Sequence, residues 1–420
     1  AGRAEGTAAT VLGTSGGAVD HPVRVSGQSA SNGLVRFDID DDGLVHIEDV
    51  PSGRAIDRAL AVVDEGDRGD SYNFGPVGSG AVTAPVSTRV VVEERGPLRA
   101  RVLVRRTYRL PEGLGVLRSA RSEATRDQVV DLRLEVREGE RFVRVRASLA
   151  NEVGNHRLRL HVPTLARDLD GSVSAGQYGT TRRGRTGEGG WGEYPLPTFP
   201  ATRFVHAGGV AVHTDRLMEY EVVTPPGPGP TESDGAGRPD EIALTLLRAV
   251  DLMSVNVHPL RDEPAGSECP VPGAQYLGTR VETDLAVDLS CPAWDDSEIV
   301  RHSDTFRFEP VVAHGAARDG EEAAEAVGPV ATTCGRVALE SLRRLDDGAL
   351  EARFVNYHHH AEPLRARMAG EWDRTDLTGG VLQEWDLPVP ASSILTLRTP
   401  GKATAPNNIP KDAPTGKEDQ

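Results

Sequence analysis

Acidic, amide and aromatic side chains are concentrated between Asp64 and Pro76. The segment reads Asp-Glu-Gly-Asp-Arg-Gly-Asp-Ser-Tyr-Asn-Phe-Gly-Pro, and its first two glycines allow the carboxylates to crowd a tight loop. Tyr72 and Phe74 alternate along its end, so one of the two rings can face solvent. Clustered acids, an amide and an aromatic ring give the acceptors and the apolar platform that sugars require. The same residues also suit an ordinary structural loop, and composition does not decide between the two.

Histidine and carboxylate side chains stand two residues apart at two places. These are His213 with Asp215 and His302 with Asp304, and on a strand each pair would present two metal ligands on one side. A hydrolytic zinc needs a third protein ligand and an open water position, and no neighbouring residue supplies the third ligand. We therefore interpret both pairs as strand-end residues and expect no metal ligand in this chain.

Two further patterns resemble metal sites. In His358-His359-His360 only the first and third side chains would converge, because alternate residues of a strand point to opposite faces. Residues 38–43 read Asp-Ile-Asp-Asp-Asp-Gly, which matches the start of a calcium loop. The twelfth position, however, is Asp49 where an EF-hand needs Glu, and the flanking residues alternate as strands. We interpret residues 38–43 as a hairpin turn.

Alternating apolar and polar residues, interrupted by Gly and Pro, predict an all-β fold. The predicted strands are residues 34–39, 44–47, 89–93, 98–110, 128–136, 142–149, 203–213, 219–223, 242–250, 337–342, 350–356 and 394–397. Residues 242–250 are almost continuously apolar, so a short helix is the alternative there. In the strand 142–149 the alternation places Arg144, Arg146 and Ser148 on a solvated face. The one predicted helix is Asp319–Val327, which is rich in Ala and Glu.

The charge and the cysteine spacing exclude several classes of protein. The chain carries 47 Lys+Arg against 63 Asp+Glu, a formal charge of −16, which disfavours nucleic-acid and acidic-membrane partners. No apolar run reaches the roughly 18 residues of a membrane helix. No signal peptide is visible either, so we expect a cytoplasmic protein. Cys269, Cys291 and Cys334 lack the close spacing of a Cys-rich zinc site or a disulfide framework.

The segment Gly69–Pro76 resembles the Gly-Asp-x-Tyr-x-Tyr/Phe-x-Pro motif in the carboxyl-terminal β region of glycoside hydrolase family 38 α-mannosidases. Further similarities follow in the family's order across about residues 30–400. They are Asn32-Gly33-Leu34, Asn155-His156-Arg157-Leu158-Arg159, and the segments 194–200, 217–221, 244–248, 272–275, 373–377 and 395–398.

This resemblance implies a domain order. After a lead-in at residues 1–29, a large β-supersandwich of the galactose-mutarotase-like type would occupy residues 30–318, and a smaller β-sandwich residues 319–400. Residues 401–420 hold all three lysines of the chain and few apolar side chains, which predicts a disordered tail.

The resemblance also implies a function. Family 38 enzymes hydrolyse terminal α-D-mannosyl residues with retention, using a zinc ion and an aspartate nucleophile on a catalytic barrel that precedes the β region. Their zinc motif begins with a His-x-His-x-Asp-like run, which this sequence lacks. We therefore expect a part of a bacterial α-mannosidase with no catalytic residue in this chain, the zinc being bound by the catalytic domain. The implied partners are a mannose-containing glycan or mannoside and that domain, with a homo-oligomer left open.

By position in the motif, Tyr72 is the expected substrate-binding residue. Its hydroxyl would bond a mannose hydroxyl while Asp70 and Asn73 hold the loop. Asp67 and Asp70 either reach the sugar or bond amides of their own loop. Two alternatives remain for the whole chain: a stand-alone carbohydrate-binding module, or a scaffold for a separately encoded catalytic chain.

Overall fold

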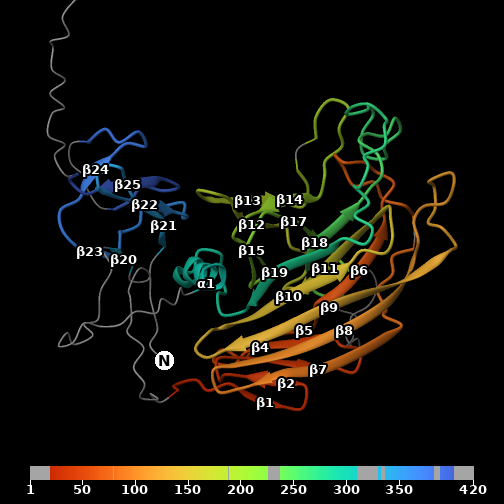
Figure 1. The fold of residues 1–420 in the computed structure, drawn as a ribbon, viewed down its shortest axis with the longest axis horizontal. Helices are drawn as coiled ribbons and strands as arrows, with labels where there is room; N and C mark the ends of the chain where they lie inside the picture. Colours follow the sequence, from red (N-terminus) through yellow and green to blue (C-terminus); the bar gives the residue numbers. More distant parts are fainter. Residues whose placement is uncertain are drawn as a thin grey trace, which may run out of the picture. The chain divides into compact units, whose positions relative to one another are not determined.

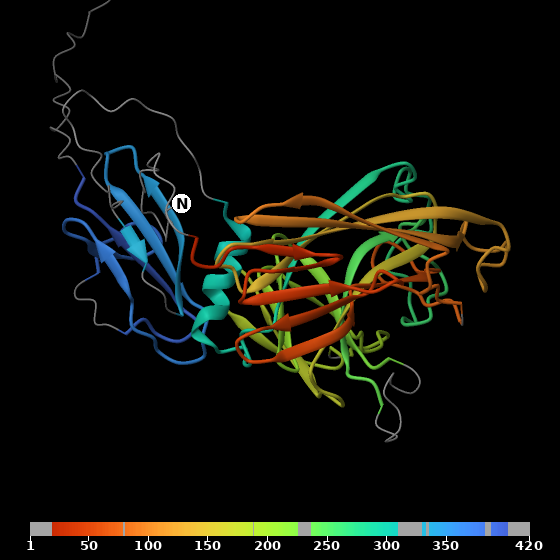
Figure 2. The same ribbon diagram turned by 90° about the horizontal axis from the view of Figure 1, so that it is seen from below.

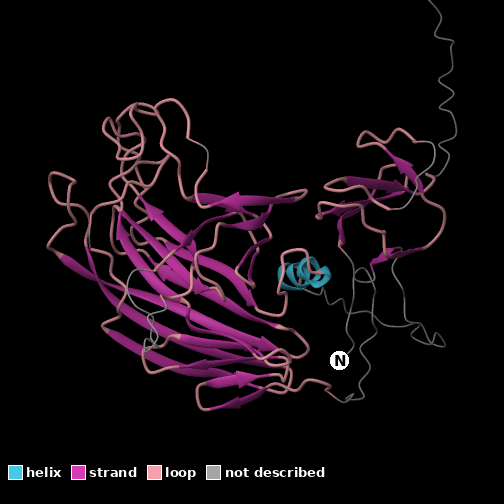
Figure 3. Cartoon of the chain, turned by 180° about the vertical axis from the view of Figure 1, so that it is seen from behind, coloured by secondary structure: helices cyan, strands magenta, loops and turns pink. Residues whose placement is uncertain are grey.

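Antiparallel strands make up nearly all of the regular structure. The computed structural model describes residues 19–78, 80–187, 189–225, 237–309, 330–332, 336–382 and 388–401. Within these ranges the single helix is α1 (Ser297–Arg307), and the rest of the regular structure is strand (Figure 3). The prediction of an all-β fold is confirmed. No helix in these ranges has the length and apolar character needed to cross a membrane.

The described residues form two compact units, 19–309 and 330–401, and the first contains three antiparallel sheets (Figure 1). The first sheet, in the order β1-β2-β3-β4-β5, consists of Arg24–Ser26, Ser29–Ser31, Val35–Ile39, Val45–Asp49 and Arg54–Ala59. The second, in the order β13-β12-β15-β16-β19-β10-β9-β8-β7, consists of Thr180–Gly184, Gly171–Ala175, Phe204–Ala207, Val210–Thr214, Arg280–Asp288, Phe142–Ala150, Thr125–Arg137, Arg99–Pro111 and Ser87–Arg95. The third, in the order β14-β17-β18-β11-β6, consists of Thr198–Ala201, Met218–Val223, Glu241–Ala249, His156–Pro163 and Ala61–Gly66.

A single apolar core joins the three sheets. Phe37 of β3, Val104 of β8, Leu132 of β9 and Leu160 of β11 are fully buried members of it. Figure 2 shows the red strands of the first sheet lying against the long orange strands of the second. Each such aliphatic or aromatic side chain contributes about 1.5–3 kcal/mol when it leaves water. Alternation of the kind seen along β8 is what places these side chains inward.

The outer face of the β8–β9 hairpin carries arginines directly opposite carboxylates. Arg105 pairs with Asp131 in the strand register, and both Nε and Nη2 of the guanidinium donate to the carboxylate at 2.7 Å. The same arrangement recurs at Arg101 with Glu135 and at Arg109 with Asp127. Partly exposed pairs of this kind are worth up to about 1 kcal/mol each. Their regular placement favours the observed register.

Helix α1 covers one face of the second sheet, which corrects two predictions. Arg144 and Ser148 of β10 are buried, not solvated, and Arg144 donates to the carbonyl oxygens of Thr305 and Phe306 in the helix. His302 and Asp304 lie within this helix, not at a strand end. The sequence signals that were missed are the Asp296 cap, which accepts from the amide of Glu298, and the apolar spacing of the following turns.

Two boundaries also differ from the predictions. The predicted strand 203–213 is a hairpin of β15 and β16, because Gly208 and Gly209 adopt φ values of +51° and +81° and turn the chain. Strand β1 falls inside the predicted lead-in, residues 1–29. The predicted helix Asp319–Val327 and nearly all of the predicted tail 401–420 lie outside the described residues.

Residues 38–43 form the predicted hairpin turn. They connect β3 to β4, and the Asp40 carboxylate accepts a hydrogen bond from the Leu44 amide at 2.8 Å. Asp49, which would be the twelfth residue of a calcium loop, is buried and accepts from Arg141 at 2.7 Å. The carboxylates of this segment therefore serve the turn and an ion pair.

The second unit contains a four-stranded sheet and a two-stranded sheet. The first, in the order β21-β22-β25-β24, consists of Val337–Arg344, Leu350–Asn356, Ile394–Arg398 and Asp373–Thr375. The second pairs β20 (Val330–Thr332) with β23 (Ala366–Met368). Phe354, Trp372 and Leu397 belong to a separate apolar core.

Candidate functional site

The loop after β6 is closed by Asp67. Its Oδ1 accepts hydrogen bonds from the amides of Gly69 and Gly75, both at 2.9 Å, and its Oδ2 accepts from Arg248 Nε at 2.9 Å. The backbone then crosses itself so closely that a Cβ on Gly69 would lie 2.1 Å from the carbonyl oxygen of Asn73. The loop can therefore form only with glycine at this position.

Asp70 anchors the outer turn of the same loop and has no accessible surface. Its Oδ1 accepts from the amides of Tyr72 and Asn73, and its Oδ2 accepts from the Val255 amide and from Arg261 Nη2 at 2.6 Å. Burial would raise the pKa of Asp70, but the hydrogen bonds from Arg261 and the backbone amides outweigh it and hold the pKa below its ordinary value. The carboxylate is thus a fixed, saturated anchor.

Arg261 joins three loops that are distant in sequence. Besides Asp70 it donates from Nη1 to Asn73 Oδ1 at 2.7 Å and from Nε to the carbonyl oxygen of Glu263 at 2.8 Å. The loop 190–194 is attached to the same segment, since the Asp262 amide donates to the Gly192 carbonyl oxygen at 2.8 Å. The planar guanidinium suits this role because its donors point in fixed, divergent directions.

Exposed aromatic rings stand on these joined loops. The side chains of Tyr72, Trp191 and Tyr194 are 54%, 92% and 51% exposed. The Tyr194 hydroxyl donates to Asp262 at 3.1 Å, whereas the Tyr72 hydroxyl makes no hydrogen bond within the described residues. The loops that follow β6 and β18 lie at one end of the first unit (Figure 1). Their exposed residues give that end aromatic faces and one available hydroxyl.

The other aromatic residue of the motif has a structural role. The Arg157 guanidinium lies 3.5 Å from the centre of the Phe74 ring, in a cation–π contact, and also donates to Glu65. His156 is fully buried between the Asp64 carboxylate at 2.5 Å and the Asn151 amide oxygen at 2.9 Å. One of the two motif rings, Tyr72 or Phe74, was expected to face solvent. Tyr72 is the more exposed of the two.

The structure shows the contacts and exposure of the predicted site residues. Asp67 and Asp70 bond amides of their own loop, Asn73 is held by Arg261, and Tyr72 points its ring outward. The sequence did not reveal Arg248 or Arg261, because these partners lie 181 and 191 residues from the acids they bind. Trp191 carried no signal beyond its large apolar side chain between glycines.

The two histidine–carboxylate pairs do not act as pairs. Asp215 bonds Arg216 and Asp304 bonds Arg203, while His213 and His302 converge on Asp288, at 3.2 and 2.8 Å. Burial would raise the pKa of Asp288, but the hydrogen bonds from both histidines hold it well below its ordinary value. Burial likewise lowers the pKa of His213, which keeps that ring neutral.

The histidine triplet lies after the end of β22 at Asn356, so its geometry does not come from strand alternation. His358 and His360 converge, with ring centres 5.8 Å apart, and Glu362 brings a third ligand atom within 4.8 Å of theirs. Arg336, however, donates to the Glu362 carboxylate at 2.8 Å and lies 3.4 Å from His360 Nε2. A guanidinium beside these groups competes directly with a metal cation.

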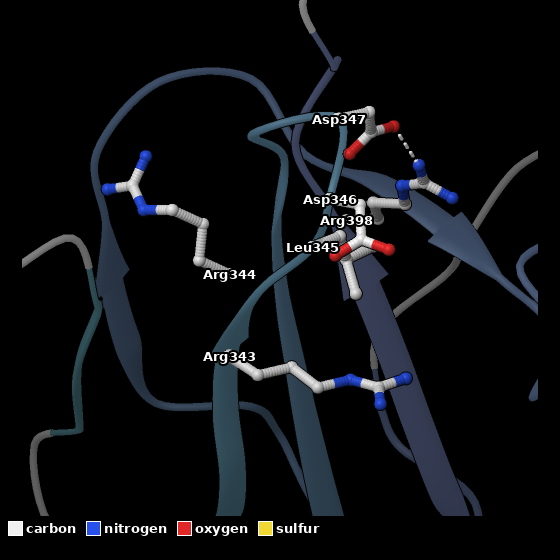
Figure 4. Close-up of a pocket in the computed structure, with 6 residues that line it drawn as sticks. All are labelled: Arg343, Arg344, Leu345, Asp346, Asp347 and Arg398. Carbon is white, nitrogen blue, oxygen red and sulfur yellow. Dashed lines mark hydrogen bonds and ion pairs between the residues drawn. The ribbon is translucent and has the colours of Figure 1, made fainter.

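A shallow hollow in the second unit is lined by charged residues at the β21–β22 turn and by Arg398 of β25 (Figure 4). Arg398 forms an ion pair with Asp347, and no aromatic side chain lines the hollow. It therefore lacks the apolar platform that a sugar ring needs, and the joined loops of the first unit remain the better site.

Comparison with known proteins addresses the fold. No family model and no curated protein matches the sequence. The crystal structure of an α-mannosidase from Enterococcus faecalis V583 superimposes with a TM-score of 0.74 and 19% identity, over 88% of this chain and 42% of that one. The fold is that of part of an α-mannosidase. A glycosyl hydrolase family 38 protein from Enterococcus faecalis matches with a TM-score of 0.74 and 18% identity, over 93% of this chain and 45% of that one.

The α-mannosidase fold confirms the resemblance stated from the motifs. The matched region is nearly all of this chain but less than half of each solved structure.

Gly69→Ala tests the closure of the α-mannosidase-like loop. Because the added methyl group would overlap the Asn73 carbonyl oxygen, we expect the free energy of unfolding to fall by about 1–3 kcal/mol. Gly190→Ala is the matched control, since no atom lies within 4 Å of its added Cβ. Guanidinium denaturation compares the two variants, and equal midpoints would contradict the geometry of the loop.

Asp70→Asn tests the buried anchor and its pH dependence. Leaving Arg261 without its carboxylate should cost about 3–5 kcal/mol at pH 7. The native pKa of Asp70 lies below that of the unfolded chain, so its contribution is present above about pH 4 and is lost as the pH falls further. The difference in stability between variant and wild type should therefore shrink on acidification. Denaturation is measured at pH 7 and below pH 4, with the exposed Asp170→Asn as control. An equal difference in stability at the two pH values would contradict this account.

Proposed function

We propose that this chain is the β region of a retaining α-mannosidase that hydrolyses terminal α-D-mannosyl residues. In this role it packs on the catalytic domain and contributes one wall of the sugar pocket. The observation that carries the proposal is the superposition of nearly the whole chain on less than half of each of two solved structures. One is an α-mannosidase and the other a glycosyl hydrolase family 38 protein.

Tyr72 is the sugar contact in this proposal. Its hydroxyl is available within the described residues, and its backbone amide is fixed by the buried Asp70 carboxylate. A contact group on such a cross-linked loop loses little conformational freedom on binding, which favours affinity. Asp70 and Asn73 act through the loop, because Arg261 and backbone amides occupy their oxygens.

The zinc of the family does not fit the residues of this loop. The carboxylates of Asp64, Asp67 and Asp70 each accept from a cationic side chain, and the sequence has no His-x-His-x-Asp run. We therefore assign the zinc, the nucleophile and the general acid to the catalytic domain.

A second candidate is a stand-alone carbohydrate-binding module. It is favoured by the exposed rings of Tyr72, Trp191 and Tyr194 on loops held together by Arg261 and Asp262. Aromatic platforms of this kind bind sugar faces without a second domain. A scaffold for a separate catalytic chain is the third possibility, and co-purification of such a chain would reveal it.

The isolated 420-residue chain should be inactive. With zinc present and an aryl α-mannoside as substrate, we expect no hydrolysis and no saturable heat on titration with millimolar mannose, because one wall of a pocket binds weakly. Hydrolysis would refute the proposal. Saturable binding that Tyr72→Ala abolishes would instead establish the module.

Tyr72→Phe tests the sugar contact in a polypeptide that also carries the catalytic domain. Loss of one hydrogen bond to mannose should lower kcat/KM about 3- to 10-fold, as expected for a neutral hydrogen bond. Tyr194→Phe is the matched control, since its hydroxyl already donates to Asp262. Equal activity of Tyr72→Phe and wild type would remove Tyr72 from the pocket.

A further inference from the structure

Three potential metal ligands meet where α1 packs on the second sheet of the first unit. Asp288 ends β19, Cys291 follows three residues later, and His302 comes from α1. One ligand atom of each lies within 4.8 Å of the other two, and all three side chains are buried. This cluster is separate from the joined loops and takes no part in the proposed sugar site.

The distances are close to those of a tetrahedral zinc site. The Cys291 sulfur lies 3.7 Å from Asp288 Oδ2 and 3.8 Å from His302 Nδ1, and these last two atoms are 2.8 Å apart. Zinc–ligand bonds of about 2.0–2.3 Å at tetrahedral angles place sulfur about 3.5 Å from nitrogen or oxygen, and nitrogen about 3.3 Å from oxygen. A small opening of the His302–Asp288 hydrogen bond would therefore complete three corners. Ser290 Oγ, which donates to Asp288 Oδ1, lies 3.4 Å from His302 Nδ1 and 3.9 Å from the sulfur and is one oxygen available for the fourth.

Neighbouring groups support such a site from outside. His213 Nδ1 has no hydrogen-bond partner in the described residues, so the ring donates from Nε2 to Asp288 and orients that carboxylate. On the far side of His302, Nε2 lies 3.2 Å from Arg301 Nη2 and 4.0 Å from Glu298 Oε2, and Arg301 also donates to Glu298. A metal on Nδ1 would place the ring hydrogen on Nε2, so the partly exposed Arg301 guanidinium would have to turn away before Glu298 could accept it.

The charge balance also favours a divalent cation. The cluster is surrounded by apolar rings, with the Phe142 ring centre 5.9 Å from those of both His213 and His302. Without a metal the cluster holds one carboxylate charge. Binding of Zn²⁺ with loss of the Cys291 thiol proton brings two negative ligands to two positive charges, so the buried site becomes neutral. Neutral sites avoid the large cost of an uncompensated charge in apolar surroundings.

We propose that Asp288, Cys291 and His302 bind a structural zinc ion that fastens α1 to the end of β19. Soft thiolate, imidazole and carboxylate together are a ligand set that suits Zn²⁺. The competing explanation is a metal-free hydrogen-bond network around Asp288. That network does not require a thiol, whose contact with Asp288 at 3.7 Å is weak.

Cobalt substitution of the full 420-residue chain, produced without a histidine tag, tests the proposal. After removal of metals with a chelator, we expect about one Zn²⁺ or Co²⁺ to bind per chain at micromolar concentration. The Co²⁺ form should show a near-ultraviolet thiolate charge-transfer band and tetrahedral visible bands. Cys291→Ala should lose the thiolate band, and Cys269→Ala, which alters the other cysteine among the described residues, should keep it.

Two further measurements make the outcome decisive. Circular dichroism checks that Cys291→Ala is folded, and a folded variant that keeps the thiolate band would overturn the proposal. His360→Asn alters the other histidine cluster, which has no cysteine, and should leave the band unchanged. Failure of the wild-type chain to bind either metal at micromolar excess would also overturn it, without bearing on the sugar site.

Discussion

The pairing of buried carboxylates with cations from distant strands and loops determines the shape of the candidate site. Asp64 meets Arg121 and His156, Asp67 meets Arg248, and Asp70 meets Arg261. All three carboxylates are fully buried, so each would be strongly destabilising without its partner. The loop that presents Tyr72 therefore adopts its observed conformation only when β11, β18 and the segment after β18 are folded.

This dependence explains what the sequence could and could not predict. Alternation along one strand is local information, and it correctly predicted β8 and β22, whereas the almost continuous apolar run at β18 had left a short helix open. The tight loop after β6 was also predictable, because its glycines and acids are adjacent. Arg261 was not, since only the folded sheet brings it to Asp70. The error at Arg144 has the same origin: a strand pattern cannot show that a helix encoded about 160 residues later will cover its outer face.

The histidines of the first unit also show that contacts between separate elements were not predictable from sequence spacing. Pairs two residues apart suggested ligands on one strand, and the structure separates each pair. His302 instead joins Asp288 and Cys291, at separations of 14 and 11 residues, through a turn and a helix. The relevant spacing depended on recognising α1, and the cap at Asp296 was the local signal that would have revealed it.

Because residues outside the short motif anchor the loop, the motif alone cannot be transferred to another protein with its structure intact. Residues 69–76 contain the exposed tyrosine, but the donors that shape them belong to other parts of the sheet. An engineer who transplanted only this octapeptide into a foreign scaffold would carry over the buried Asp70 without the Arg261 that neutralises it. The smallest transferable unit is therefore the loop together with Arg248 and Arg261 on their supporting backbone, a surface assembled from three regions of the gene.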